Sequence, residues 1–96
     1  MRKEDVLKLL SQHKPELVQR FGITDLALLG SIARDEAMDA SDVDVMVEFE
    51  RRSTAKRYLG VQLYLEDLLK RPVDLVQKEV VGPELKSYVE RDLIHV

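Results

Sequence analysis

The sequence predicts one α/β domain over residues 1–96, built on a small and mostly covered β-sheet. Two patterns indicate this class: some segments repeat apolar residues at helical spacing, and the short runs between them are apolar or alternating. Gly or Pro stands at several boundaries between these segments. The resulting order is helix, strand, helix, strand, helix, strand, helix, which is typical of an α/β fold. A chain of 96 residues has room for one hydrophobic core.

Helix and strand alternate in the first half of the chain. Apolar residues at helical spacing run over residues 3–13, and Pro15 disfavours a continuous helix, so two helical pieces are expected before Gly22. Residues 23–30 form an apolar run closed by glycine, which indicates a buried strand. Ser31 is then expected to act as the N-cap of a short helix.

A strand, a helix, a strand and a helix are expected after a loop at 38–41. Residues 42–49 alternate in polarity, and the face expected to join the core comprises Val43, Val45, Val47 and Phe49. Residues 54–70 have the periodicity of an amphipathic helix, whose apolar stripe is expected to hold Val61, Leu65 and Leu68, with Leu59, Leu63 and Leu69 beside it. Residues 71–77 are a third strand with Pro near its start, and residues 82–94 a Gly-Pro turn with a final helix.

The composition excludes several classes of protein. A net charge of −3 argues against a chain built mainly to coat nucleic acid, so no direct nucleic-acid contact is expected. The absence of cysteine excludes disulfides and thiolate metal sites and fits a reducing cytoplasm. The charged first ten residues do not form a secretory signal, and no segment has the roughly 20 apolar residues of a membrane span. We therefore expect a cytoplasmic protein that is not bound to a membrane.

Asp42 and Asp44 stand one residue apart in the predicted strand, on the face opposite the core. Burying unpaired carboxylates is costly, so a compensating cation is expected beside them. Mg²⁺ suits the pair, because it takes one or two protein carboxylates and completes its shell with water and phosphate oxygens. Asp74 supplies a third carboxylate if the second and third strands are neighbours. Three acids and two ions are what a two-metal phosphoryl or nucleotidyl transfer requires.

Gly30 and Ser31 stand where a strand gives way to a helix, which suits the binding of a phosphate group. Glycine lets a phosphate approach the backbone closely, and a helix N-terminus presents unpaired N–H groups and a positive dipole end. The Ser31 hydroxyl can add a further hydrogen bond, and Arg34, one turn on, can also reach the phosphates. A nucleotide bound there would place its metal ions on Asp42 and Asp44.

Each motif alone also has an ordinary structural explanation. An Asp-x-Asp pair is more often a solvated strand face than a metal site, and Gly-Ser before a helix is more often an N-cap. The joint spacing, Gly-Ser-x10-Asp-x-Asp with a later strand aspartate, favours the functional interpretation. The patterns of an EF-hand, a P-loop and a dinucleotide-binding loop are not present in the sequence.

The combination resembles the minimal nucleotidyltransferase family of the DNA polymerase β-like superfamily, whose signature is a Gly-Ser followed by an Asp-x-Asp strand. The resemblance covers nearly the whole chain and includes HKPELVQRFG, LALLGSIARDEA, SDVDVMVEF, RPVDLVQ and LKSYVERDLIHV. It implies the polymerase β-like fold, a small mixed sheet flanked by helices, with two Mg²⁺ ions and usually ATP as substrate. Family members often continue the first motif as Ala-Arg-Gly-Glu, whereas residues 33–36 read Ala-Arg-Asp-Glu. The added acid is expected to weaken nucleotide binding.

The resemblance also implies a role for each motif residue. Gly30 and Ser31 match the phosphate-binding pair, and Asp42 and Asp44 match the metal ligands. Asp74 matches the third acid, which helps to hold the catalytic metal and can act as a base toward the acceptor hydroxyl.

The expected partner follows from size and from the same resemblance. A second domain for an acceptor is not expected in 96 residues, so a partner protein or a second copy is expected to supply that surface. In the family, the partner is a ribonuclease toxin of the HEPN class, and the nucleotidyltransferase is its antitoxin, in some members by transferring AMP to a toxin tyrosine. Protein adenylylation is therefore the leading hypothesis.

Other functions stay open at this point. The chain could be a binding module that neutralises its partner by occlusion, or it could transfer a nucleotide to a small molecule. Nucleic-acid polymerisation is disfavoured by the acidic balance. A basic cluster could face the triphosphate or an acidic partner, or be merely solvated, and it comprises Arg51, Arg52, Lys56 and Arg57.

Overall fold

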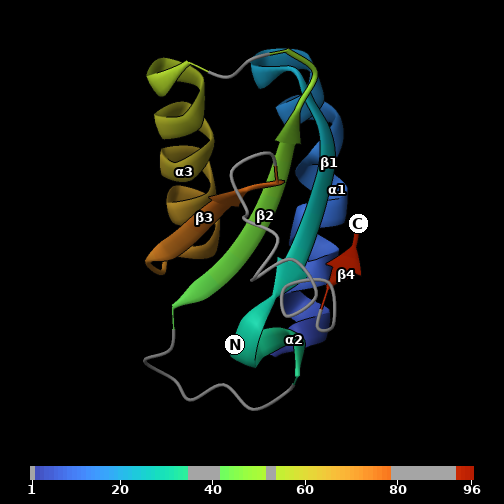
Figure 1. The fold of residues 1–96 in the computed structure, drawn as a ribbon. Helices are drawn as coiled ribbons and strands as arrows, with labels where there is room; N and C mark the ends of the chain where they lie inside the picture. The colour runs from blue at the N-terminus through green and yellow to red at the C-terminus, as the bar shows by residue number, and fades with distance from the viewer. Residues whose placement is uncertain (1, 35–41, 52–53, 79–92) are drawn as a thin grey trace.

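The computed structural model describes residues 2–34, 42–51, 54–78 and 93–96. Its helices and strands are α1 (Lys3–Phe21), β1 (Ile23–Leu29), α2 (Gly30–Ala33), β2 (Val43–Phe49), α3 (Ala55–Leu69), β3 (Val73–Gln77) and β4 (Ile94–His95) (Figure 1). The loop expected at 38–41 and nearly all of the turn and helix expected at 82–94 lie outside the described residues. Ile94 was expected at the end of that helix, but it pairs with Leu28 of β1 as part of β4, so the prediction is wrong there.

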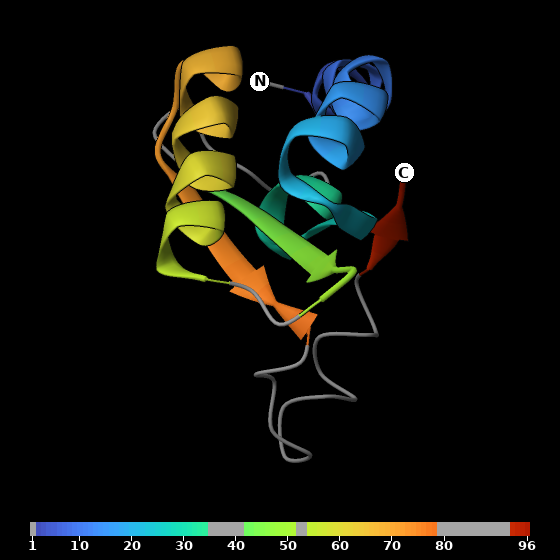
Figure 2. The same cartoon turned by 90° about the horizontal axis from the view of Figure 1, so that it is seen from above.

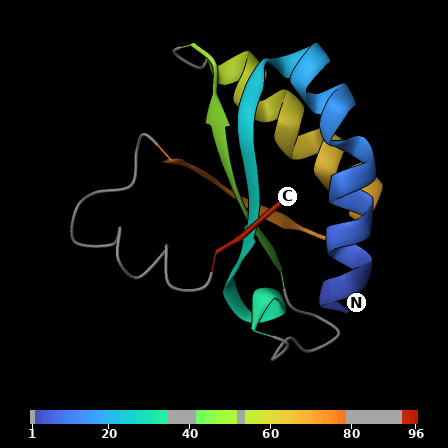
Figure 3. The same ribbon diagram turned by 90° about the vertical axis from the view of Figure 1, so that its right-hand side faces the viewer.

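Four strands form a mixed sheet in the order β3-β2-β1-β4. β1 is antiparallel to both of its neighbours, whereas β2 and β3 run parallel. α3 connects the parallel pair, and α1 and α3 lie side by side over one face of the sheet (Figures 2 and 3). The expected mixed sheet flanked by helices is confirmed.

The hydrophobic core lies between this face of the sheet and the two long helices. The alternation predicted for the second strand is confirmed, because the buried side chains of β2 include Val43, Val45, Val47 and Phe49. Met46 is also buried, although it is not on the core face. It lies on the same face as Asp44, opposite Ala27 of β1, yet it is only 4% exposed.

α1 is one continuous helix, and the two helical pieces expected around Pro15 are not observed. Pro15 removes the hydrogen bond that the Ser11 carbonyl would accept, but both residues are exposed, so water can hydrate that carbonyl. Leu10 and Leu17 are fully buried on either side of the proline, and burying both requires the helix to continue. Gly22 ends α1 in the left-handed conformation, and its N–H donates to the Val18 carbonyl.

α3 begins at a side-chain cap, because the Thr54 hydroxyl accepts a hydrogen bond from the Arg57 N–H. Its fully or nearly fully buried stripe comprises Val61, Leu65 and Leu69. Leu59 and Leu63 were expected beside that stripe, but they face solvent, with 52% and 64% of their surface exposed. Within the described residues, no helix combines the length and the apolar character that crossing a membrane requires.

Gly60 is required where α3 packs on α1, and its replacement by alanine is expected to destabilise the protein. Helix propensity alone predicts a gain of roughly 0.8–1.0 kcal/mol for Gly60→Ala. An added Cβ would lie 2.5 Å from the Phe21 Cε1 atom, so the ring, which also packs edge-on to Tyr64, must move. Overpacking of this kind costs about 1–3 kcal/mol, which exceeds the gain. Chemical denaturation of the wild type and the variant measures the difference.

A Phe21→Leu background is the control for this prediction. Removing the ring removes the clash, so Gly60→Ala is expected to become neutral or stabilising there. Stabilisation by Gly60→Ala in the wild-type background would contradict the proposed contact.

Candidate active site

Two of the three predicted acids are paired by the sheet itself. Asp44 of β2 and Asp74 of β3 are direct partners in the parallel register. Neighbouring strands lie about 4.8 Å apart, and paired residues point to the same face, so the two carboxylates project together. Asp42 immediately precedes β2 and is exposed, as is Asp74, whereas Asp44 is partly buried. The second and third strands are neighbours, which is the condition under which Asp74 was expected to join the other acids.

Gly30 passes directly over the Asp44 carboxylate. Its φ of +81° is in the left-handed region, and a Cβ placed on it would lie 2.1 Å from the Asp44 Oδ2 atom. Leu29, the residue before it, is the antiparallel partner of Asp44, which fixes this close approach. Only glycine therefore fits this position, both for its backbone conformation and for the space it leaves to the acid.

The acids repel one another electrostatically. Burial raises the pKa of the Asp44 carboxyl above its ordinary value, and the neighbouring charges of Asp74 and then Asp42 raise it further. The positive charge of Arg34 acts in the opposite direction. Three carboxylates and one arginine therefore lie close enough to influence one another. Their combined electrostatic potential favours the binding of a cation or of a metal-bound phosphate.

The acids fit a magnesium ion by their chemistry. Oxygen ligands from one or two carboxylates, completed by water and phosphate oxygens, are the usual protein set for Mg²⁺. Within the described ranges, no three Asp, Glu, His or Cys side chains are grouped closely enough to hold a metal ion. The backbone thus fixes the pair Asp44 and Asp74, and Asp42 would have to turn toward them when it binds a shared ion.

α2 differs from the helix expected after Gly30. It is a single turn that starts at Gly30, with Leu29 as its N-cap and no capping side chain, so the prediction of Ser31 as the N-cap is wrong. A single turn has unpaired N–H groups but only a weak dipole. The backbone of Ser31 lies in this turn, and the role of its hydroxyl stays a prediction. Arg34 follows the turn with an exposed side chain, close enough to influence Asp44.

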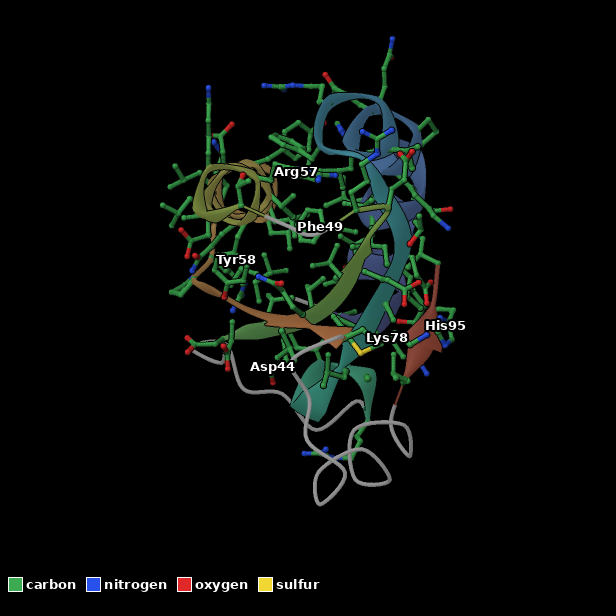
Figure 4. All side chains as sticks on the ribbon, turned by 45° about the horizontal axis from the view of Figure 1, so that its top comes forward. Asp44, Phe49, Arg57, Tyr58, Lys78 and His95 are labelled. Carbon is green, nitrogen blue, oxygen red and sulfur yellow. The ribbon has the colours of Figure 1, made fainter. Side chains whose placement is uncertain are left out.

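Arg57 of the basic cluster has a structural role at the other end of the molecule. Its Nε donates to the Phe21 carbonyl at 2.8 Å and its Nη2 to the Gly22 carbonyl at 3.2 Å. Its guanidinium also lies 5.0 Å from the centre of the Phe49 ring. Figure 4 places Arg57 and Phe49 at the opposite end of β2 from Asp44. Arg57 therefore joins the end of α1 to the start of α3 and does not face the acids.

Three side chains in one row on α3 bind the backbone of β3, and none of them is among the site residues expected from the sequence. The Tyr58 hydroxyl donates to the Leu75 carbonyl at 2.6 Å. The Gln62 side-chain amide donates to the Val73 carbonyl at 3.1 Å. The carboxylate of Glu66 accepts from the Val73 N–H at 3.0 Å. The detectable signal was their four-residue spacing, which places polar groups on one side of a helix.

Comparisons with known proteins agree with this fold and site. Residues 10–96 match the family of the nucleotidyltransferase domain. A protein adenylyltransferase of Thermococcus cleftensis, MntA, is 37% identical over 93 residues, which cover 97% of this chain and 94% of that protein. A protein of Methanocaldococcus jannaschii provisionally named as a protein adenylyltransferase is 37% identical over 95 residues, covering 96% of this chain and 95% of its own.

Comparison with solved structures agrees with these sequence comparisons. One chain, provisionally described as a minimal nucleotidyltransferase, superposes with a TM-score of 0.82 at 34% identity, covering 98% of this chain and 95% of its own. A chain of a toxin–antitoxin complex with AMP-PNP has a TM-score of 0.70 at 20% identity, covering 99% of this chain and 72% of its own. A chain from the tri-AMPylated HEPN toxin–MNT antitoxin complex of Shewanella oneidensis has a TM-score of 0.61 at 19% identity, covering 97% of this chain and 66% of its own. The last two share the fold.

A mixed sheet that places two acids level on adjacent parallel strands, beneath a glycine turn, defines an enzyme of the nucleotidyltransferase class. The chain belongs to the nucleotidyltransferase domain family, and within it to the minimal nucleotidyltransferases.

Proposed function

We propose that this protein transfers AMP from ATP, with Mg²⁺, to a tyrosine hydroxyl of a partner HEPN ribonuclease toxin in the cytoplasm, and so acts as its antitoxin. The observation that carries the proposal is the register that sets Asp44 level with Asp74 beside Gly30. The names of its relatives support adenylyl transfer, and the toxin–antitoxin complexes among its structural neighbours support the partner.

Each site residue has a defined task in this proposal. Asp42, Asp44 and Asp74 would hold Mg²⁺, which compensates the charge of the triphosphate and of the leaving group when bound. Gly30, Ser31 and Arg34 would bind the phosphates. The acceptor oxygen attacks the α-phosphorus, the bond from that phosphorus to the bridging oxygen breaks, and pyrophosphate leaves. Asp74 takes the proton of the acceptor hydroxyl.

Neutralisation by occlusion is the second candidate function. A bound partner would be inhibited by contact alone, and the acids would contribute little. The aligned pair of acids favours the enzyme, because an occluding surface has no need of two repelling carboxylates in direct register.

Transfer of labelled ATP tests the proposal. The protein is incubated with Mg²⁺, α-labelled ATP and a partner protein of the HEPN class, and mass spectrometry locates the added group. We expect α-label on a tyrosine of the partner, and no label from γ-labelled ATP, because AMP and not phosphate is transferred.

Variants complete this experiment. Asp44→Asn should remove the label, whereas Glu48→Gln, a matched change further along the same face of β2, should keep it. A stable complex without label would favour occlusion. Label that persists in Asp44→Asn would contradict the assignment of the site.

A further inference from the structure

We propose that Tyr58, Gln62 and Glu66 of α3 are positioning residues that keep Asp74 level with Asp44. The proposal rests on the function proposed above, in which Asp74 takes the proton of the acceptor. These three residues are called the α3 row below. In the described part of the chain they do not hydrogen-bond to the acids, and they lie away from the place where the nucleotide is expected. They act through the backbone of β3.

The topology makes β3 a strand that needs support. It is five residues long and lies at an edge of the sheet, so β2 is its one hydrogen-bonded neighbour among the strands that the structure describes. In a parallel pair, successive residues turn their backbone groups alternately toward and away from the neighbour. Pro72 turns its carbonyl toward β2, where it accepts from the Val43 N–H at 3.0 Å. Val73 and Leu75 therefore turn theirs toward the open edge.

The α3 row occupies this open edge on both sides of the third acid. Val73, just before Asp74, is bound through both its N–H and its carbonyl, and Leu75, just after it, is bound through its carbonyl. The backbone of Asp74 is thus held by β2 on one side and flanked by three fixed groups on the other. Figure 4 shows Tyr58 on α3, close to β3.

The acids themselves explain why such support is required. Asp44 and Asp74 are direct partners on adjacent strands, so their two negative charges repel and favour separation of β3 from β2. A misplacement of about 1 Å at a reacting group can cost roughly 10²-fold in rate. The α3 row opposes that displacement without adding a charge to the face where the nucleotide would bind.

Two tyrosine variants on the same helix test the proposal. Tyr58→Phe removes the hydroxyl that donates to Leu75, whereas Tyr64→Phe removes a hydroxyl that donates to Glu16 of α1 and contacts the His13 Nδ1 atom at 2.6 Å. We expect similar losses of global stability from both. Only Tyr58→Phe should speed hydrogen exchange of the β3 amides, about tenfold or more relative to the β1 amides, and lower kcat about tenfold with KM for ATP within twofold.

Glu66 provides the rescue experiment. Glu66→Met removes the acceptor of the Val73 N–H and is expected to reproduce the Tyr58→Phe pattern, whereas Glu66→Gln keeps an acceptor oxygen and should restore both exchange protection and kcat.

Equal acceleration of exchange in β1 and β3, or faster β3 exchange with an unchanged kcat, would overturn the proposal. If the wild-type protein transfers no label to the partner, this result contradicts the proposed function but not the structural role of the α3 row. Selective β3 exchange would then still support the role of the α3 row, and uniform exchange would overturn it.

Discussion

Asp44→Asn is expected to abolish nucleotidyl transfer while making the protein more stable. A metal ligand contributes several kcal/mol to transition-state stabilisation, so the rate should fall by at least about 100-fold. Stability should rise because the substitution removes a charge that burial, Asp74 and Asp42 all disfavour. Asp44 is only partly buried, and solvent screening limits the gain to about 1 kcal/mol or less. This corresponds to no more than roughly 4–8 °C in Tm for a domain of this size.

The gain in stability that Asp44→Asn produces should depend on pH in a defined direction. The folded-state pKa of Asp44 lies above its unfolded value of 3.8, so the folded protein binds more protons between these two values. Stability of the wild type therefore falls as pH rises through this interval and stays reduced above the folded-state pKa. Without divalent ions, the difference in Tm between Asp44→Asn and the wild type should be absent well below pH 3.8 and constant at neutral pH.

Glu48→Gln is the control for both measurements. Glu48 shares the face of β2 with Asp44 but lies further along the strand, where Lys78 contacts its carboxylate at 3.6 Å. This change should leave transfer intact and should not raise Tm. A loss of stability in Asp44→Asn would mean that repulsion among the acids is not a significant cost.

Gly30→Ala is expected to inactivate the enzyme by displacing Asp44. The Cβ would stand 2.1 Å from the Asp44 Oδ2 atom, and the φ of +81° is unfavourable for alanine. Either the carboxylate or the turn must move by about 1 Å, for which we expect a loss of about 100-fold in kcat. Backbone strain should reduce the free energy of unfolding by about 1–3 kcal/mol. Transfer assays and chemical denaturation measure the two effects.

Gly22→Ala separates strain from function. Gly22 also has a left-handed backbone, with a φ of +68°, and its added Cβ would meet the Arg57 guanidinium, which binds the Phe21 and Gly22 carbonyls. A comparable loss of stability is expected without a loss of kcat, because this glycine lies at the end of the sheet away from the acids. Equal activity of the Gly30→Ala and Gly22→Ala variants would contradict the role given to Gly30.

Local sequence patterns were sufficient to locate β1, β2 and β3 and to place an acid in each of the last two. Two-residue alternation separates the core face of β2 from the face of Asp44, and the apolar flanks of Asp74 identify β3. These signals are properties of each strand alone. That the two strands are parallel neighbours in direct register depends on the crossover through α3, which alternation within a strand cannot specify.

The predictions made from the sequence were wrong where tertiary contacts outweigh the local conformational preference of the chain. Pro15 is tolerated in α1 because its lost hydrogen bond falls on the solvent side. β4 pairs only Ile94 and His95 with β1, too short a run for alternation to detect. Arg57 belongs to a run of basic residues, and its carbonyl acceptors at the end of α1 could be identified only from the fold.

The two edge strands of the sheet, β3 and β4, affect how the protein can associate with other chains. An exposed strand edge is a template for pairing with further strands and a cause of aggregation. Along β3, side chains of α3 already bind the outward groups of Val73 and Leu75, and at the other end β4 contains only two residues. Continuation of the sheet into a neighbouring molecule is therefore disfavoured at both edges. Assembly through side-chain surfaces is expected instead.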